Sequence, residues 1–572
     1  MRLRVVRRDR GTGGESLGAG LHPVLSRVYR ARGVRSAQEL DTALEHLWPV
    51  STLESVDAAA ELLLAERAAG RILVVGDFDA DGATSSALML RALRAWGFEV
   101  DFLVPNRFTF GYGLTPQIVR VAAERSPSLI VTVDNGIASL AGVEAARALG
   151  IGVLITDHHL PGRELPAARV IVNPNLPGSR FASRALAGVG VAFYVLAALR
   201  RRLEAAGLIG AEAPSPAQWL DLVALGTVAD LVPLDRNNRV LVEQGLRRIR
   251  AGRCVPGIRA LLEAAGRPLE RLTATDLAFA VAPRLNAAGR LDDMSIGIQC
   301  LLEEPEQAAA LAQRLDALNR ERREIEARMQ AEALAAVRVL DEPRGAPVQR
   351  SAVCLFDASW HQGVVGLVAS RVKERVRRPV IAFALGGDGE LRGSARSVSG
   401  VHIRDVLAQL DARHPGLIVR FGGHAMAAGL TLPYARLDEF AALLDAEVAA
   451  WPQGGSPADA IETDGELAVE EIALETAEAL RAGGPWGQAF PEPSFDGVFT
   501  VRKARVVGER HVKLWVQGAR NRTFDAIAFN LLDPHSRTEL PQGELRLVYR
   551  LDVNEYQGER RLQLLVDHLL PA

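Results

Sequence analysis

Short apolar runs alternate with longer amphipathic stretches in the first half of the chain. The runs are rich in Val, Ile and Leu, which is typical of buried strands, whereas the stretches between them repeat their apolar residues with helical spacing. A helix is predicted after Gly82, in ATSSALMLRALRAWG. Strands that alternate with helices predict a parallel sheet with helices on both faces. The predicted strands are RILVVGDFD at 71–79, VDFLVPN at 100–106, LIVTVDNG at 129–136, GVLITDHH at 152–159 and RVIVNP at 169–174.

The pattern changes three times further along the chain. Helical periodicity dominates from Gly188 to about residue 300, and one long charged helix follows, whose length suits a connector between domains. A second α/β unit comes next, with SAVCLFDA and PVIAFAL as strands and GVVGLVASRVKERV as a helix. After WPQGGSPAD, which has the composition of a linker, strands recur at roughly ten-residue spacing and predict a small barrel.

These changes predict five regions. They are an N-terminal extension at 1–50, whose role the sequence does not indicate, an α/β domain at 51–300, a connecting helix at 301–345, a smaller α/β domain at 346–450 and a β-barrel at 460–572.

Composition places the chain among ordinary globular proteins. Of its 572 residues, 48% are hydrophobic and 24% are charged, which excludes wholesale disorder. No apolar run is long enough for a membrane helix, and the basic N-terminus lacks the apolar core of a secretory signal. The three cysteines lie far apart without CxxC spacing, which excludes a disulfide scaffold and a thiolate zinc site and favours a reducing cytoplasm.

The cations are almost all arginine. Lysine occurs only at Lys373, Lys503 and Lys513, a bias that a GC-rich genome would explain. The net charge of −2 means that the whole chain is not a generic polyanion binder. The planar guanidinium nevertheless suits phosphate, so a basic groove can exist inside a neutral protein.

Acidic and histidine side chains follow the predicted strands. Because alternate residues of an extended segment face the same way, three Asp in GDFDADG are predicted to converge on one side. The carboxyl ends of parallel strands meet at one edge of a sheet, where such sheets bind ligands. The residues concerned are Asp77, Asp79 and Asp81, then Asp134, then Asp157, His158 and His159, with Asp230 at a helix-rich turn further on.

Each of these residues has a simpler explanation when taken alone. Asp134-Asn135-Gly136 has the composition of a turn, and an isolated His pair is usually a hydrogen-bonded loop feature. Their joint occurrence on three successive strand ends is different, because crowded carboxylates need a cation among them. Oxygen and imidazole ligands suit Mn²⁺, Mg²⁺, Fe²⁺ or Zn²⁺, and the excess of oxygen favours Mn²⁺ or Mg²⁺. Two such ions predict phosphoryl hydrolysis without a Ser or Cys nucleophile.

Seven segments resemble those of one enzyme superfamily. GDFDADG, VTVDNG, TDHH and GTVADLVPL, in this order, are similar to the four motifs of the DHH phosphoesterases. SWHQGVVGLVASRVKERVRRPVIAF, GSARSVSG and FGGHAMAAG resemble the companion DHHA1 domain. With APRLNAAGRLDD and the barrel, the chain from about residue 50 to its end is similar to the bacterial single-stranded-DNA-specific exonucleases of that superfamily.

The resemblance implies a fold and a function. The implied fold is α/β, with a parallel-sheet DHH domain, a smaller α/β DHHA1 domain joined by a long helix, and an OB-like C-terminal barrel that binds nucleic acid. The implied function is 5′→3′ hydrolysis of single-stranded DNA to 5′-mononucleotides with two Mn²⁺ or Mg²⁺ ions, in repair and recombination. It also implies a cytoplasmic monomer, away from membranes, with a helicase and a single-strand-binding protein as candidate partners.

The resemblance assigns roles within the acidic cluster. Asp134 matches the carboxylate that bridges both ions, and His159 matches a catalytic His nearer the scissile phosphate. Asp77 stands where more distant relatives carry His, which makes it a possible ligand or a catalytic residue that supports a ligand. The positions of the metal ligands are matched by Asp79, Asp81, Asp134, His158 and Asp230.

The resemblance also indicates residues that bind the nucleic acid. A hydroxyl and a bidentate guanidinium in GSARS suit a 5′-terminal phosphate, and a glycine pair lets backbone N–H groups approach phosphate. Taken alone, Arg107 would be a surface arginine, and PRLNAAGR would be a capping loop at a helix terminus. The candidates are Arg107, Arg284, Asn286, Arg290, Ser394, Arg396, Gly422, Gly423 and His424.

The barrel carries aromatic residues that suit base stacking, although core packing accounts for at least half of such residues. They are Phe499, Trp515, Phe524, Phe529, Tyr549 and Tyr556.

Two other functions stay open. Smaller relatives that hydrolyse oligoribonucleotides or cyclic dinucleotides resemble the DHH and DHHA1 portions, but they typically lack the long connector and the barrel. An inactive replication scaffold on the same fold predicts lost metal ligands, whereas every expected ligand is present.

Overall fold

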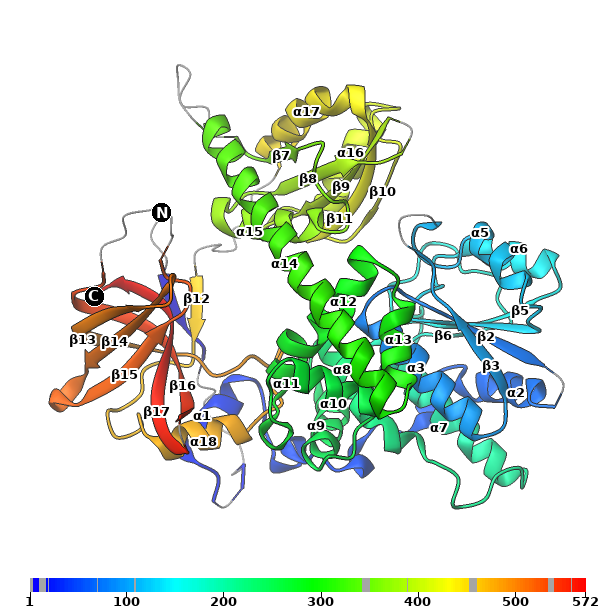
Figure 1. Cartoon of the computed structure of the whole chain (residues 1–572), viewed down its shortest axis with the longest axis horizontal. Coiled ribbons are helices and arrows are strands. Elements are labelled where there is room, and N and C mark those ends of the chain that lie inside the picture. Colours follow the sequence, from blue (N-terminus) through cyan, green and yellow to red (C-terminus); the bar gives the residue numbers. More distant parts are fainter. Residues whose placement is uncertain are drawn as a thin grey trace. The chain divides into compact units, whose positions relative to one another are not determined.

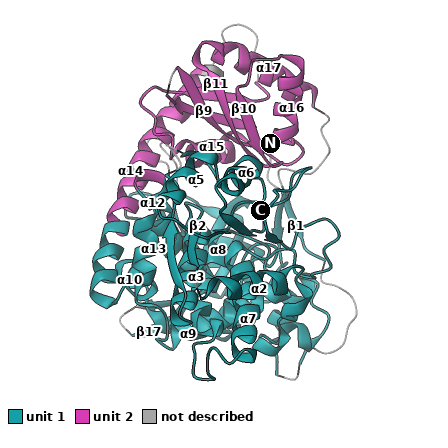
Figure 2. Cartoon of the chain, turned by 90° about the vertical axis from the view of Figure 1, so that its right-hand side faces the viewer, with its two compact units in different colours: residues 1–289, 293–315, 460–572 teal, residues 290–292, 316–459 magenta. Residues whose placement is uncertain are grey.

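The structure is a computed structural model of the chain. It describes residues 4–9, 17–18, 20–68, 70–106, 110–341, 350–387, 389–451, 460–532, 540–556 and 558–572. The chain forms two compact units (Figure 2). Unit 1 comprises residues 1–289, 293–315 and 460–572, and unit 2 comprises residues 290–292 and 316–459.

A parallel five-stranded sheet lies at the centre of the first α/β region (Figure 1). Its strand order is β3-β2-β4-β5-β6. The chain leaves β2 towards β3 on one side and returns to β4 on the other, so the switch point of this sheet lies between β2 and β4. The strands are β2 (Arg71–Gly76), β3 (Glu99–Leu103), β4 (Leu129–Val133), β5 (Gly152–Thr156) and β6 (Val170–Val172).

Helices cover both faces of this sheet, as the alternating pattern predicts. Val, Ile and Leu on the strands are buried, which is typical of a parallel sheet enclosed on two sides. One face packs against α5 (Pro116–Ala123) and α6 (Leu140–Ala148). The other lies against α2 (Val56–Glu66), α3 (Ala80–Ala95) and α7 (Gly188–Ala205) (Figure 1).

A helical layer follows the sheet in unit 1. The five residues Leu277–Val281 form a π-helical turn that leads directly into α12. The helices are α8 (Leu220–Ala229), α9 (Arg236–Arg250), α10 (Pro256–Ala264), α11 (Ala274–Asp276), α12 (Ala282–Leu291) and α13 (Ser295–Leu302).

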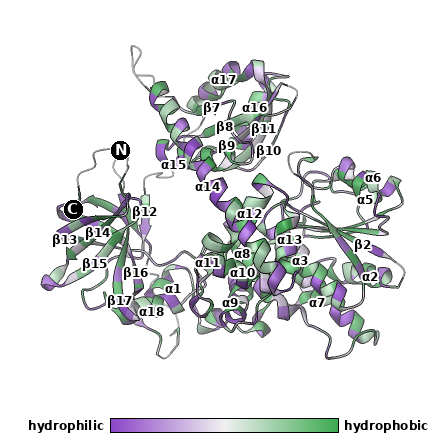
Figure 3. Cartoon of the chain, in the orientation of Figure 1, coloured by the Kyte–Doolittle hydropathy of each residue, from purple (hydrophilic) through white to green (hydrophobic). Residues whose placement is uncertain are grey.

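The predicted connecting helix is α14 (Pro305–Asp341), with 37 residues. It begins in unit 1 and continues in unit 2, and Figure 3 shows many hydrophilic residues along it.

Unit 2 has its own mixed sheet, in the order β10-β11-β9-β8-β7. Among the strands described in this unit, only β7 and β8 are parallel, and the other pairs are antiparallel. The strands are β7 (Val353–Phe356), β8 (Val380–Leu385), β9 (Glu390–Arg396), β10 (Arg420–Gly423) and β11 (Ala427–Pro433). The helices are α15 (Val365–Val376), α16 (Ile403–Arg413) and α17 (Leu437–Ala450).

The C-terminal strands close into a barrel in the order β13-β14-β15-β17-β16. Strands β15 and β17 pair in parallel and close it, which is typical of a small Greek-key barrel of the OB type. The strands are β13 (Phe495–Val507), β14 (His511–Gln517), β15 (Thr523–Ala528), β16 (Gly543–Tyr556) and β17 (Glu559–Pro571). The predicted fold class is therefore confirmed in all three parts.

The N-terminal segment packs against the C-terminal region. Strand β1 (Arg4–Arg7) pairs in parallel with β12 (Ala460–Thr463), and α1 (Pro23–Ala31) contacts α18 (Leu474–Ala482). Arg32 and Asp464 form a buried two-bond ion pair at 2.7 and 3.0 Å. This packing gives the N-terminal segment a structural role within unit 1.

Short 3-10 turns complete the described secondary structure. They lie at Ala37–Leu40, Leu44–His46, Val50–Thr52, Pro216–Trp219, Leu269–Arg271, Tyr434–Arg436 and Ala519–Asn521. Within the described parts of the chain, no helix has both the length and the apolar character needed to cross a bilayer.

Candidate active site

The carboxyl ends of β2, β4 and β5 bring acidic side chains to one edge of the parallel sheet. Gly76 pairs with Val133, and Val133 with Thr156, so the residues that follow these strands start level with one another. Asp77 follows β2 and Asp134 follows β4, on the two sides of the switch point. Both carboxylates are buried, with 5% and 2% of their surface exposed.

Helix α3 begins at Ala80, which corrects the prediction that it starts after Gly82. Asp79 is the N-cap, and its carboxylate accepts the N–H groups of Asp81 and Gly82, each at 3.0 Å. Ending the extended segment at Asp79 satisfies two free donors of the first turn. We expected Asp77, Asp79 and Asp81 to converge as alternate residues of one extended segment. That expectation is wrong for Asp81, which lies in the first turn of helix α3.

The N-terminus of α7 fixes Asp81 from the opposite side. The two carboxylate oxygens of Asp81 accept the N–H groups of Gly188, at 2.7 Å, and of Val189, at 2.9 Å. A Cβ atom on Gly188 would lie 2.6 Å from the Cβ of Asp134, so a glycine is needed for this close approach. Asp134 has a φ of 61°, a strained conformation that tends to occur at functional sites.

His158 lies among three carboxylates. Its Nε2 atom is 3.1 Å from Asp134 Oδ1, 3.4 Å from Asp230 Oδ2 and 3.9 Å from Asp81 Oδ2. Among the described residues, the buried polar atoms Asp134 Oδ1 and His158 Nε2 have no hydrogen-bond partner. An unsatisfied buried nitrogen beside an unsatisfied buried oxygen is the arrangement that a shared cation would complete.

Three groups of side chains in this cluster have the spacing of metal ligands, with all ligand atoms of a group within 4.8 Å of one another. Asp134 and His158 each belong to two groups, so neighbouring ions could share ligands. The residues fit divalent cations because oxygen ligands predominate. The groups are Asp77, Asp79 and Asp134; Asp81, His158 and Asp230; and Asp134, His158 and His159.

The electrostatics of the cluster also favour a cation. Burial, and then the charges of neighbouring carboxylates, raise the pKa of Asp134 well above its usual value. The same causes raise the pKa of Asp81 to about 7 and that of Asp230 to about 9. Burial, and then the neighbouring His159, lower the pKa of His158 to about 4, which leaves its imidazole neutral and able to bind a metal.

His159 has the opposite protonation state. Burial alone would lower its pKa, but the hydrogen bond to Asp157 and the charges of Asp157, Asp230 and Asp77 outweigh burial and raise it to about 9. The bond joins His159 Nδ1 to Asp157 Oδ1 at 2.8 Å. The same oxygen accepts the N–H groups of His158 and His159, at 2.7 and 3.1 Å. Sequence reasoning placed Asp157 in the cluster without a role, whereas its contacts show that it orients both histidines.

The candidates in PRLNAAGR lie on helix α12. Asn286 Oδ1 accepts the N–H of Ala80 at 2.8 Å, which ties this helix to the start of α3. Arg284 is buried and donates to the carbonyl of Ala280 at 2.5 Å. Arg290 donates to the carbonyl of Gly363 at 3.2 Å. Arg107 lies outside the described residues.

Ser394 and Arg396 lie together on β9 in unit 2. Arg396 Nη1 donates to Ser394 Oγ at 2.9 Å. A Cβ atom on Gly366, in the first turn of α15, would lie 2.9 Å from both side chains. The missing side chain thus lets a hydroxyl and a guanidinium approach a helix N-terminus, and all three features favour an anion. Sequence reasoning missed Gly366.

The glycine-rich turn lies on the same sheet as this pair. A Cβ atom on Gly422 or on Gly429 would meet no described atom within 4 Å. Gly422 on β10 pairs with Gly429 on β11, and Gly429 pairs with Ser394 on β9. Gly423 has a φ of 140°, and His424 N–H donates to the carbonyl of Ala427 at 2.8 Å. These glycines form a strip of sheet without side chains that leads to Ser394. Gly429 was not among the predicted candidates, and its position adds it to Gly422 and Gly423.

The barrel separates its aromatic residues into two groups. Phe499, Phe524 and Tyr549 are buried in its core, and Phe529 is 55% exposed. Trp515 is half-buried and has Lys503 and Lys513 at 5.1 and 5.4 Å from its ring. Two of the three lysines of the chain thus flank one indole. The side chain of Tyr556 lies outside the described residues.

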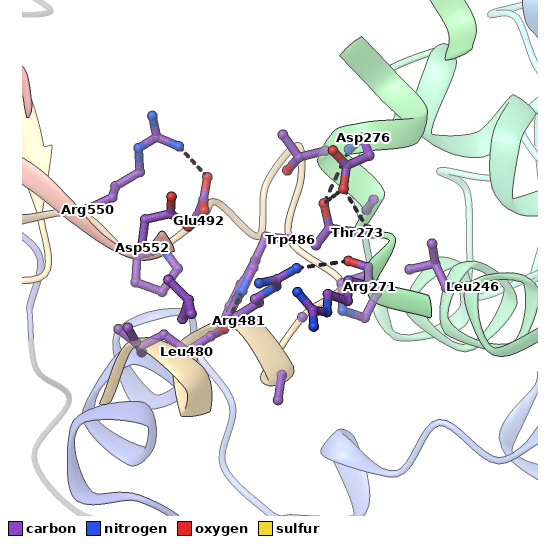
Figure 4. Close-up of a pocket in the computed structure, with 18 of the residues that line it drawn as sticks. Leu246, Arg271, Thr273, Asp276, Leu480, Arg481, Trp486, Glu492, Arg550 and Asp552 are labelled. Carbon is purple, nitrogen blue, oxygen red and sulfur yellow. Dashed lines mark hydrogen bonds and ion pairs between the residues drawn. The ribbon is translucent and has the colours of Figure 1, made fainter. Parts of the chain in front are cut away.

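A cavity of about 550 Å³ lies in unit 1 between the helical layer and the barrel (Figure 4). Its arginines are paired within the protein: Arg550 with Glu492 at 2.6 Å, and Arg481 with the carbonyl of Arg271 at 3.2 Å. Because its cations are already paired, the cavity does not have the character of a phosphate site.

Comparison with known protein families gives three matches. Residues 71–227 match the DHH family, N-terminal domain, residues 348–450 match the DHHA1 domain, and residues 463–568 match the RecJ OB domain.

Individual relatives match over nearly the whole chain. The single-stranded-DNA-specific exonuclease RecJ of Dickeya dadantii (strain 3937) is 53% identical over 575 residues, with 99% of each chain covered. The protein of the same name from Escherichia coli (strain K12) is 51% identical over 562 residues, with 97% of each covered.

Solved structures of one relative also match. The crystal structure of RecJ from Thermus thermophilus in complex with Mn²⁺ has a TM-score of 0.81 and 30% identity, and the match covers 100% of this chain and 80% of that one. The structure of that protein with Mg²⁺ has a TM-score of 0.75 and 28% identity, with 100% and 78% covered.

Proposed function

The chain belongs to the RecJ family of single-stranded-DNA-specific exonucleases, and we propose that it removes nucleotides from the 5′ end by hydrolysis at the carboxylate–histidine cluster. The observation that carries this proposal is the sharing of ligands. Asp134 and His158 each take part in more than one group with metal-ligand spacing, at the carboxyl edge of a parallel sheet beside its switch point.

We propose that Asp77, Asp79 and Asp134 hold one cation and that Asp81, His158 and Asp230 hold another, with Asp134 shared. Mn²⁺ or Mg²⁺, which the Thermus thermophilus crystal structures contain, would supply Lewis acidity and positive charge at the phosphate. The protein itself orients these ligands through the N-termini of α3 and α7, which bind Asp79 and Asp81.

His159 acts as the catalytic group closest to the substrate in this proposal. Against the effect of burial, the hydrogen bond to Asp157 and the charge of that carboxylate, which is not among the proposed metal ligands, raise the pKa of His159 and favour its charged imidazole, and Asp157 fixes its ring. A positively charged donor stabilises the charge that develops on phosphate oxygens during in-line displacement.

Other features indicate where the strand binds. The pair Ser394 and Arg396 beside the N-terminus of α15, with the glycine strip of β10 and β11, suits a terminal phosphate and the backbone that follows it. Gly422, Gly423 and His424 remain proposed contacts of that kind. The barrel, with Trp515 between two lysines, suits a single strand held by stacking and charge. For Arg284, Asn286 and Arg290, contacts inside the protein support a role in holding the site together.

The test is digestion of a single-stranded DNA oligonucleotide labelled at either end. We expect 5′-mononucleotides from the 5′ end with Mn²⁺, none with chelator, and none from Asp134→Ala, which removes the shared ligand. A duplex of the same sequence is the specificity control and should resist digestion.

Two outcomes would contradict the proposal. Hydrolysis of a cyclic dinucleotide without action on the long strand would place the protein with the small-substrate phosphodiesterases, which typically lack a barrel of this kind. Strand binding without hydrolysis of any substrate would indicate an inactive scaffold, despite the complete ligand groups.

The remaining expectations stay predictions. They are action in the cytoplasm, a monomeric state, a helicase and a single-strand-binding protein as partners, and use in repair and recombination.

A further inference from the structure

Tyr112 is placed at the active site by a loop that has a glycine in the left-handed conformation on either side of it. Gly111 and Gly113 have φ values of 78° and 73°, in the left-handed region that favours glycine. The loop is then fixed from beyond Gly113, since Leu114 is buried and its N–H donates to Ser139 Oγ at 3.1 Å. These constraints hold the tyrosine against the carboxyl edge of the sheet.

The aromatic ring of Tyr112 lies between two residues of the site. It meets Phe78 edge to face at 5.9 Å, and it meets His159 edge to face at 6.1 Å. Phe78 lies between Asp77 and Asp79, so the ring contacts the GDFDADG segment through Phe78 and the TDHH segment through His159. Yet Tyr112 remains 49% exposed, which a ring recruited only for core packing would not be.

The hydroxyl of Tyr112 lies 3.5 Å from His159 Nε2, the ring nitrogen that Asp157 does not hold. This separation is long for a direct hydrogen bond. It is short enough for one oxygen atom to lie within about 2.8 Å of both groups. A phenol keeps its proton at neutral pH and can therefore donate to an anionic oxygen.

We propose that the Tyr112 hydroxyl is a catalytic hydrogen-bond donor to a non-bridging oxygen of the scissile phosphate, next to His159. The inference rests on the proposed function and adds a substrate contact to it. The phosphate gains negative charge on its non-bridging oxygens in an in-line displacement, so a fixed donor there contributes more in the transition state than in the bound substrate.

The first test compares Tyr112→Phe with the unmodified enzyme on a 5′-phosphorylated single strand with Mn²⁺. The substitution keeps the ring and its contact with Phe78 and removes only the hydroxyl. We expect kcat to fall by about 10- to 100-fold, the cost of one donor to a developing charge, with KM changed by less than about threefold. Tyr434→Phe, at a tyrosine of similar exposure (51%) in unit 2, is the matched control and should leave both constants unchanged.

The second test detects the contact itself. Sulfur replaces one non-bridging oxygen of the scissile phosphate, and each diastereomer is assayed separately. Sulfur is a poor hydrogen-bond acceptor, so the diastereomer that places sulfur opposite Tyr112 should slow the unmodified enzyme more than Tyr112→Phe, by about fivefold or more. The other diastereomer should slow both enzymes equally. A residue that only supports the fold would not produce such a stereospecific difference.

The outcomes separate the two proposals. An unmodified enzyme that does not digest single strands would overturn the proposed function. An active enzyme whose Tyr112→Phe variant keeps the same kcat, or shows the same sulfur effect as the unmodified enzyme with each diastereomer, would overturn the role of Tyr112 alone. Equal melting temperatures of the two proteins exclude misfolding as the cause of a loss.

Discussion

At the residue scale, the site is a set of carboxyl groups that cannot all carry their charge in the absence of a cation. Asp81, Asp134 and Asp230 all have raised pKa values, caused first by burial and then by the charges of their neighbours. In the unfolded chain each would ionise near pH 4. The folded protein therefore holds protons at neutral pH that the unfolded chain has lost, and raising the pH weakens the metal-free fold.

This arrangement predicts that metal binding releases protons. With the pKa of Asp230 at about 9, Mn²⁺ must displace a proton at pH 7, so apparent affinity should rise with pH up to about 9. Calorimetric titration of metal-free protein in two buffers of different ionisation enthalpy should show release of at least about one proton per protein.

The variant Asp230→Asn provides the control for this measurement. It keeps the size of the side chain and removes one ionisable group, so it should release fewer protons and bind Mn²⁺ more weakly. Equal heats in both buffers for the unmodified protein would show that the carboxylates are already ionised, contrary to the raised pKa values.

The sequence predicted the types of residue at the site and their place at strand ends. It predicted neither the role of Asp157 nor the position of Tyr112, because a hydrogen bond to His159 and an edge contact with Phe78 depend on side-chain geometry. The signal for Tyr112 was nonetheless present, since a tyrosine between two glycines in GYG is held by backbone conformations that few other residues adopt.

At the scale of elements, helix N-termini position the ligands. The start of α7 contacts two of the proposed metal ligands. The N–H of Gly188 donates to Asp81, and the Cα of Gly188 packs beside Asp134. Gly188→Ala would place a methyl group 2.6 Å from the Cβ of Asp134, against a backbone that cannot yield easily. We expect Mn²⁺ affinity and kcat to fall by about tenfold or more, as when groups that orient ligands are displaced.

Gly190→Ala, on the same helix, is the matched control for this variant. Among the described residues, the atom nearest to its Cβ would be the end of the Leu186 side chain, at 2.9 Å, rather than a backbone atom. Alanine is favoured over glycine in a helix by about 1 kcal/mol, so this variant should keep its activity and be as stable as the unmodified protein or slightly more so. Similar losses of Mn²⁺ affinity and kcat in both variants would contradict this prediction. They would mean that the first turn of α7 tolerates no larger residue at either glycine, whether or not that residue contacts Asp134.

Element boundaries were the least predictable feature at this scale. The start of α3 differs from the prediction by a few residues because Asp79 caps the helix, which a hydrophobic pattern does not reveal. PRLNAAGR, taken alone, suggests a capping loop, yet it forms α12 behind a π-helical turn. Burial of Arg284 and the contact of Asn286 with Ala80 stabilise that helix, and neither is visible from local sequence.

At the scale of the whole molecule, the sequence predicted the parallel-sheet part, the long helix, the second α/β part and the barrel, but not which distant segments pair. Strand β1 pairs with β12, and Arg32 with Asp464, across most of the length of the chain. Such pairing depends on tertiary contacts between segments that carry no shared motif. The N-terminal segment, without an assigned role from sequence, thus becomes part of the scaffold that supports the barrel region.

The barrel should contribute binding of long strands rather than chemistry. Trp515→Ala removes a stacking surface worth about 1–3 kcal/mol per base, so KM for an oligonucleotide long enough to reach the barrel should rise several-fold, with kcat unchanged. Lys503→Ala should also reduce the dependence of log affinity on log salt by about 0.7, since about 0.7 counterions are released per phosphate contact on a single strand. Lys373→Ala, which removes the same single charge from α15 in unit 2, is the control and should leave the slope nearly unchanged. An equal rise in KM for the shortest substrates that the active site accepts would contradict this role, because it would place Trp515 in the path of every substrate.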